Sequence, residues 1–161
     1  MTATLDPHAD DEPGIRGILE VIVRDPGGAL VDRRRVHNLI TTAGRKFLVR
    51  ALTTGAVDVK LQIAVGRGQS PPRIENSALD DMLARADVRE WKFAEPLSDG
   101  RLRIILHAEL PAADDVEHSI REAGLLVSHR DDGPILFNRA LLPVLTWTRD
   151  VSLSLDWEIT L

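Results

Sequence analysis

The last eleven residues of the chain constrain its fold most, because apolar and polar side chains alternate there without exception. The apolar positions are Val151, Leu153, Leu155, Trp157, Ile159 and Leu161, and the polar positions between them are Ser152, Ser154, Asp156, Glu158 and Thr160. Successive side chains of a β-strand point to opposite faces of the sheet. The segment therefore predicts a half-buried strand of an antiparallel sheet, with one face in the core and the other exposed.

Two patterns near the start of the chain predict a hairpin and a helix. Residues 17–38 contain two apolar runs separated by the turn sequence Asp-Pro-Gly-Gly, which is typical of a β-hairpin. Residues 41–55 change to helical spacing and place their apolar side chains on one stripe. Thr41 or Thr42 can cap the start of this helix, and Gly55 can end it.

A second helix is predicted over residues 76–87. Ser77 and Asp80 have the spacing of a capping box, which satisfies the free amides at a helix start. The helical stripe that accompanies them consists of Leu79, Met82, Leu83 and Ala86. With about six to eight strands elsewhere, the chain is expected to be α+β: mainly an antiparallel β-sandwich with two short helices in its N-terminal half.

The length of 161 residues predicts one β-sandwich domain, residues 14–161. Residues 1–13 lack apolar periodicity and are expected to form a flexible arm. This acidic start differs from a signal peptide, and no apolar stretch approaches the roughly 20 residues of a membrane span. We therefore expect a protein that is made in the cytosol and contacts no membrane.

Several classes of chemistry find no support in the sequence. The absence of cysteine excludes thiol nucleophiles, disulfides and cysteine-ligated metals. The net charge of −5 lacks the basic excess of a nucleic-acid surface. His107, His118 and His129 lie eleven residues apart, not at metal-ligand spacing, and adjacent acidic pairs such as Asp131-Asp132 lie in turns, at a helix start or near the terminus. We expect no enzyme activity, no cofactor, no metal and no nucleic-acid partner.

The segment "VGRGQSPP" superficially resembles a phosphate-binding loop. Gly66 and Gly68 follow a predicted strand, but the third glycine of the dinucleotide motif and the Gly-Lys-Ser/Thr ending of a P-loop are missing. We interpret the segment as a turn that needs positive φ, followed by the rigid pair Pro71 and Pro72.

Four features are candidates for a protein interface, and the last of them is the arm at residues 1–13. The basic run is Arg33, Arg34 and Arg35, which either forms the exposed part of a hairpin strand or meets an acidic neighbour. The second candidate is the loop with Pro71 and Pro72. The third is "LLPVLTW", whose Leu142 and Trp147 flank a proline that interrupts sheet pairing; they are either exposed to a partner or part of an ordinary core.

Five segments follow one another in a characteristic order: "NLITTAGRKFLVRAL", "LQIAVGRGQSPP", "SALDDMLARADV", "IREAGLLVSHRDDGPILFNRALLPV" and "LSLDWEITL". From about Asn38 to Leu161 this order resembles a family of bacteriophage tail proteins, the group around the tail-fibre or tail-collar amino-terminal domain. Members of this family are also found in phage-tail-like contractile injection systems. The matching positions are Gly66 and Gly68 in a Gly-x-Gly loop, Glu122 and Gly124 in a Glu-x-Gly motif, and Trp157 in the closing strand. The chain departs from the family pattern at Asn138 and Arg139, where the family often has Ala-Arg, and in the predicted hairpin from Gly17 to His37, which precedes the resembling part.

The resemblance implies a structural component of a phage tail or tail-like particle. The chain shows no long repetitive shaft, which favours a baseplate or fibre-attachment adaptor over a receptor-binding fibre. Such a protein would be made in the bacterial cytoplasm and assembled into the virion tail or tail-like particle. It would form a trimer or hexamer and bind other tail, baseplate or fibre proteins through symmetric contacts.

Glu122 is expected to have a structural role. It should accept hydrogen bonds from backbone amides or pair with an arginine such as Arg139, while Gly124 allows close backbone packing.

The alternative function is a carbohydrate- or receptor-binding β-sandwich module. With Trp157 pointing inward, Trp91 and Trp147 remain as its aromatic platform.

Overall fold

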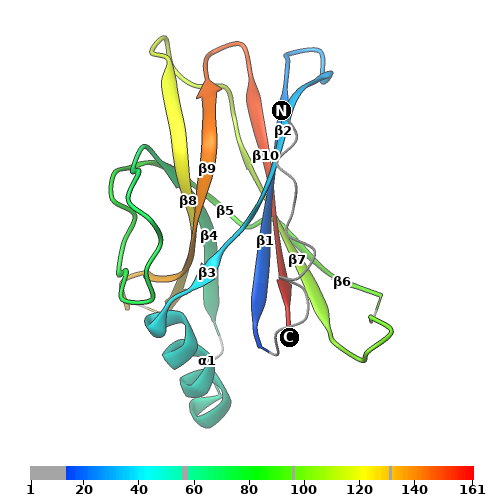
Figure 1. Cartoon of the computed structure of the whole chain (residues 1–161), viewed down its shortest axis with the longest axis vertical. Coiled ribbons are helices and arrows are strands. Elements are labelled where there is room, and N and C mark those ends of the chain that lie inside the picture. The colour runs from blue at the N-terminus through cyan, green and yellow to red at the C-terminus, as the bar shows by residue number, and fades with distance from the viewer. Residues whose placement is uncertain (1–13, 56–57, 96, 131) are drawn as a thin grey trace.

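The computed structural model describes residues 14–55, 58–95, 97–130 and 132–161, which form two five-stranded antiparallel sheets and one helix (Figure 1). The strands are β1 Arg16–Arg24, β2 Leu30–His37, β3 Leu39–Ile40, β4 Val59–Gly66, β5 Met82–Asp87, β6 Glu90–Ala94, β7 Arg103–Leu110, β8 His118–His129, β9 Ile135–Trp147 and β10 Ser152–Thr160, and the helix is α1 Thr42–Thr54. The first sheet has the order β2-β1-β10-β7-β6, and the second has the order β3-β9-β8-β4-β5. The predicted arm, residues 1–13, lies outside the described residues.

The core lies between the two sheets, as the alternation in the sequence predicts. In β10 every second side chain is buried, and Trp157 is completely enclosed. Strand β1 pairs with β10 along its whole length and shows the same alternation. From the second sheet, alternate residues of β4, β8 and β9 join the same apolar cluster. The predicted β-sandwich is therefore confirmed in its main architecture.

Helix α1 begins where the sequence predicts and is fixed to the second sheet at its start. Thr41 is the N-terminal cap, and its side chain accepts a hydrogen bond from the Gly44 amide at 3.0 Å. The Thr41 amide in turn donates to the Phe137 carbonyl of β9 at 3.0 Å. A Cβ atom at Gly44 would lie 2.9 Å from the Phe137 carbonyl carbon, so only glycine allows this close approach. Gly55, with φ of 62°, ends the helix.

The predicted second helix is wrong. Residues 82–87 are strand β5, which pairs antiparallel with β4, and residues 74–81 are irregular. The stripe at helical spacing divides between two environments: Leu79 packs on the outer face of the second sheet, whereas Leu83 and Ala86 pack against the main core. The Asp80 amide binds the side chain of Glu122 instead of a capping residue, so the capping box does not form.

No helix in the described part of the chain is both long and apolar enough to cross a membrane.

Candidate functional site

Glu122 of β8 and Arg139 of β9 form an ion pair that is completely buried on the outer face of the second sheet. Arg139 Nε and Nη2 lie 3.0 and 2.9 Å from Glu122 Oε2, and both side chains are 0% exposed. Alternation places them there, because the neighbouring Ala123 and Ala140 point into the main core. The loop at residues 67–81 connects β4 and β5 and lies beside the second sheet (Figure 1), and its amides bind the Glu122 side chain.

The Glu122 carboxylate fixes this loop at both of its ends. Its Oε1 accepts hydrogen bonds from the amides of Gly68 at 2.9 Å and Asp81 at 2.8 Å, and its Oε2 accepts one from Asp80 at 3.1 Å. A buried carboxylate is tolerated only when it is paired and hydrogen-bonded, and here three amides and a guanidinium meet both needs. The two roles that the sequence left as alternatives for Glu122 thus occur together in the structure.

Arg139 contacts the same loop through its remaining donors. Its Nη2 lies 2.9 Å from Asp80 Oδ2, and its Nη1 donates to Asn76 Oδ1 at 3.1 Å and Ser70 Oγ at 3.3 Å. The Ser70 hydroxyl also donates to Asp80, and together with the Arg139 charge it lowers the pKa of this carboxyl although burial acts in the opposite direction. The guanidinium therefore joins β9 to three positions of the loop.

Glycines surround this ion pair because the carboxylate occupies the space that a side chain would need. A Cβ at Gly66 would lie 2.7 Å from Glu122 Oε1, and one at Gly68 would lie 2.7 Å from Glu122 Cδ. Neither glycine has positive φ, so the predicted positive-φ turn is wrong. Gly124 leaves room for the Leu79 side chain, which a Cβ would approach to 3.0 Å. We call this arrangement of Glu122, Arg139 and residues 67–81 the loop clamp.

A small apolar cluster completes the attachment of the loop. Leu79 packs on the outer face of the second sheet with Ala64 of β4, Leu126 of β8 and Leu136 of β9, all at most 8% exposed. Burial of these side chains adds a non-directional attraction to the hydrogen bonds of the loop clamp. The loop is therefore packed as well as hydrogen-bonded.

The other predicted site residues lie apart from the loop clamp. Trp157 belongs to the core of the first sheet. Leu142 and Trp147 are only 6% and 8% exposed, so the interpretation of these two as exposed interface residues is wrong: β9 continues through Pro143 and keeps both in the core. Trp147 also donates through Nε1 to the Pro111 carbonyl at 3.1 Å.

The basic run lies on β2, an edge strand of the first sheet. Arg33 and Arg35 are exposed, whereas Arg34 is half-buried. Arg33 Nη2 lies 2.5 Å from Glu20 Oε1 of β1, and Arg34 pairs with Asp32. Two of the three charges are thus already neutralised within the chain, and Arg35 opposes Glu20 in the register of β1 and β2.

The three histidines singled out in the sequence are not brought together. His107 lies on β7 of the first sheet, and His118 and His129 lie at opposite ends of β8 in the second sheet. Nδ1 of His107 is 2.6 Å from Asp156 Oδ1. Burial alone would lower the pKa of His107, but the hydrogen bond and charge of Asp156, helped by Glu109, raise it.

At least three clefts in the described part of the chain lie away from the loop clamp, and two of them border histidines singled out in the sequence. One of about 450 Å³ lies between α1 and the β8–β9 turn, with Lys46, Arg50 and His129 on its wall. The other, of about 260 Å³, lies beside Trp91 of β6 and includes His107 and Asp156. Neither includes Glu122 or Arg139, so the buried pair has no access to a substrate through either cleft.

Sequence reasoning missed two parts of the site. Ser70 and Asn76 were not singled out, because polar residues in a loop have no spacing that reveals a distant partner. The exposed aromatic pair on β6, Trp91 and Phe93, was also missed as a pair. The alternation of aromatic and charged residues in "EWKFA" is a signal that could have found it.

No protein-family model, curated protein or solved structure matches the chain at a significant level. The resemblance to phage tail proteins stays a prediction from the order of the motifs.

Proposed function

We propose that the chain is a structural component of a phage tail or phage-tail-like particle, where it serves as a baseplate or fibre-attachment adaptor. The observation that supports this most is the convergence of three motifs in the loop clamp. The Gly-x-Gly loop, the Glu-x-Gly segment and Arg139 are far apart in the sequence, yet they contact one another. Apart from Trp157, which lies in the main core, the motif residues therefore have a common structural role.

The loop clamp favours binding of a partner over chemistry. Because Glu122 is buried and already bonded to three amides and a guanidinium, it has no free position for a substrate. A surface loop that is held in one conformation loses little entropy when a partner binds it. We therefore assign the loop at residues 67–81, with exposed Pro71, to contacts with other tail proteins.

The proposal is tested by native mass spectrometry of the chain mixed with tail proteins encoded beside its gene. A complex of defined stoichiometry is expected, and Pro71→Ser together with Pro72→Ser should weaken it. The matched control is Pro26→Ser in the exposed β1–β2 turn, which should leave the complex unchanged. Absence of any complex with all candidate proteins would overturn the proposal.

A specific observation also supports the alternative, a carbohydrate-binding module. Trp91 is 62% exposed, and its ring lies 5.7 Å from the ring of Phe93, which is 66% exposed. Exposed aromatic rings side by side suit the apolar face of a sugar. Glycan-array binding that is lost in Trp91→Ala, with no complex formed with tail proteins, would favour this alternative. Trp147 is buried and takes no part.

A further inference from the structure

We propose that β6 pairs antiparallel with β6 of a second copy of the chain, so that the first sheet continues across a two-fold axis. The biological role of this contact, assembly of the particle, rests on the proposed function. The geometry of the strand pairing is argued from β6 alone.

Strand β6 is one of the two edge strands of the first sheet, and β2 is the other. Within the described residues β6 pairs with β7 on one side and with no strand on the other (Figure 1). An edge strand presents unpaired amides and carbonyls, which another strand can bind. The strand is five residues long, so a second copy can pair with it through a short ladder.

An uncovered aromatic pair distinguishes this edge. Trp91 and Phe93 oppose Leu106 and Ile104 of β7, so all four point to the core-facing side of the first sheet. Leu106 is 2% exposed, whereas Trp91 and Phe93 are 62% and 66% exposed. The contrast shows that the second sheet covers β7 and leaves β6 bare.

The two rings already contact each other on this bare surface. Their centroids lie 5.7 Å apart in an edge-to-face arrangement. Two adjacent aromatic side chains exposed on an open sheet edge form the kind of apolar surface that a partner covers. Rings from a second copy would cover them on the same side of the continued sheet.

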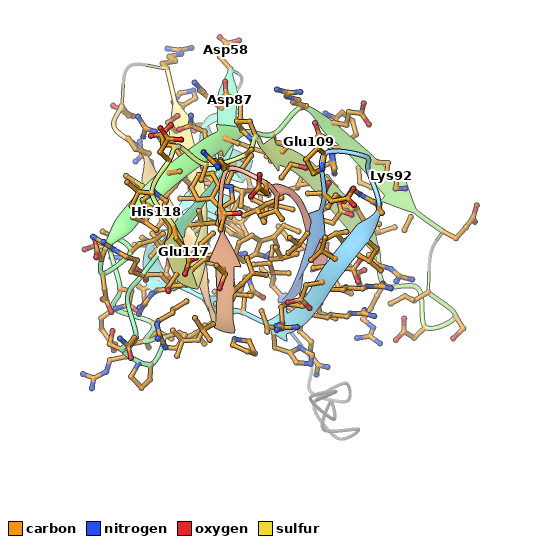
Figure 2. All side chains as sticks on the ribbon, turned by 90° about the horizontal axis from the view of Figure 1, so that it is seen from above. Asp58, Asp87, Lys92, Glu109, Glu117 and His118 are labelled. Atoms are coloured by element: carbon orange, nitrogen blue, oxygen red, sulfur yellow. The ribbon has the colours of Figure 1, made fainter. Side chains whose placement is uncertain are left out.

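The charges of β6 select one register for this pairing. Glu90 and Lys92 lie on the face opposite to the aromatic residues, and Lys92 lies at the outer margin of the molecule in Figure 2. A two-fold axis normal to the sheet keeps the aromatic faces of both copies on one side of the continued sheet. In each allowed register the axis therefore passes beside one residue of β6, which lies opposite the same residue of the second copy. A ladder centred on Trp91 places Glu90 opposite Lys92 of the second copy, twice by symmetry.

The neighbouring registers are less favourable. A ladder centred on Glu90 opposes two carboxylates, and one centred on Lys92 opposes two ammonium groups. Like charges directly opposite each other destabilise a strand pair, whereas opposite charges and aromatic pairs stabilise it. The same-chain neighbours of these charges on β7 are His107, opposite Glu90, and Ile105, opposite Lys92. We therefore assign the register centred on Trp91.

A two-fold contact also limits the symmetry of the assembly. It builds a dimer, and with a second contact it builds a hexamer of D3 symmetry. It does not build a cyclic trimer. Of the two oligomers expected from the resemblance, this contact is compatible with the hexamer.

The test is a charge exchange across the strand pair, followed by sedimentation velocity of the full chain over a range of concentrations. Glu90→Lys and Lys92→Glu each place like charges opposite each other, so each is expected to weaken self-association about tenfold or more. The double variant Glu90→Lys/Lys92→Glu restores opposite charges. Its self-association is expected to return to within about threefold of the wild type.

Controls separate the register from general charge effects. Glu117→Lys and Lys46→Glu make the same charge changes at exposed sites away from β6 and should leave self-association unchanged. Thermal unfolding checks that each variant is folded. A double variant as weak as the single variants, or a wild type that remains monomeric at about 100 µM, would overturn the inference.

The outcome is distinguishable from that of the proposed function. If the chain binds tail proteins but the charge exchange has no effect, the β6 contact is wrong and the adaptor function stands. If the charge exchange restores the dimer but no tail protein binds, the contact stands without that function.

Discussion

Removal of the Glu122 carboxylate is expected to cost much of the stability of the protein. In Glu122→Ala the guanidinium of Arg139 stays buried, with Asp80 as its remaining carboxylate neighbour. Removing one partner of a buried ion pair costs about 3–5 kcal/mol, because the other charge is left uncompensated. We therefore expect the free energy of unfolding to fall by about 3–5 kcal/mol.

The loss of the hydrogen bonds to the loop amides should bring the destabilisation toward the upper end of this range. The substitution also takes the acceptor from the amides of Gly68, Asp80 and Asp81. Each buried donor without a partner costs about 1–3 kcal/mol. These costs do not simply add to the loss of the ion pair, because the loop can open and expose its amides to water. An open loop in Glu122→Ala should be cut faster by proteases than the wild-type loop.

A double variant separates the charge from the packing. The double variant Glu122→Leu/Arg139→Met leaves no buried charge in place of the pair. Its loss of stability should therefore be smaller than the sum of the losses in the single variants Glu122→Leu and Arg139→Met. Equilibrium unfolding in urea measures all of these variants. Asp115→Ala is the control, since Asp115 pairs with Arg149 at the surface, and no measurable change is expected. A loss below about 1 kcal/mol in Glu122→Ala, or strict additivity in the double variant, would show that the buried ion pair does not hold the loop as described.

Three further substitutions have expected outcomes in unfolding experiments. Gly68→Ala should lower stability by roughly 1–3 kcal/mol, because its Cβ would meet the buried carboxylate; an unchanged melting temperature would contradict this. Thr41→Ala removes the cap of α1 and should cost about 1 kcal/mol, with a stability equal to wild type as the contrary result. Asp156 and Glu109 raise the pKa of His107 despite its burial, so protonated His107 stabilises the fold. His107→Gln should therefore be less stable than wild type below about pH 6.5, and the difference should disappear as the pH rises through the raised pKa; a difference independent of pH would exclude this role.

Local patterns predicted the parts of the fold that depend on neighbouring residues. The alternation around Trp157 predicted β10, because a strand with one buried face needs only that pattern. Thr41 and Gly55 predicted both ends of α1, because a cap acts within one helical turn. The tight turn at residues 25–28 predicted the β1–β2 hairpin, where Gly28 has a φ of 85°.

The part that failed depends on a residue about forty positions away. Asp80 and Asp81 resemble a helix start, but their amides bind Glu122 across the sheet, and this contact holds the segment open as a loop. Gly66 and Gly68 were assigned to a positive-φ turn for the same reason. The sequence reveals a glycine but not the distant carboxylate that needs its space.

If Glu122 holds the loop at residues 67–81 in one conformation, amide hydrogen exchange of the wild-type protein will show it. The amides of Gly68, Asp80 and Asp81 should exchange about as slowly as those within β4, although none of the three lies in a strand or helix. Exchange of these three amides at the rate of exposed, unbonded loop amides would contradict this role of Glu122.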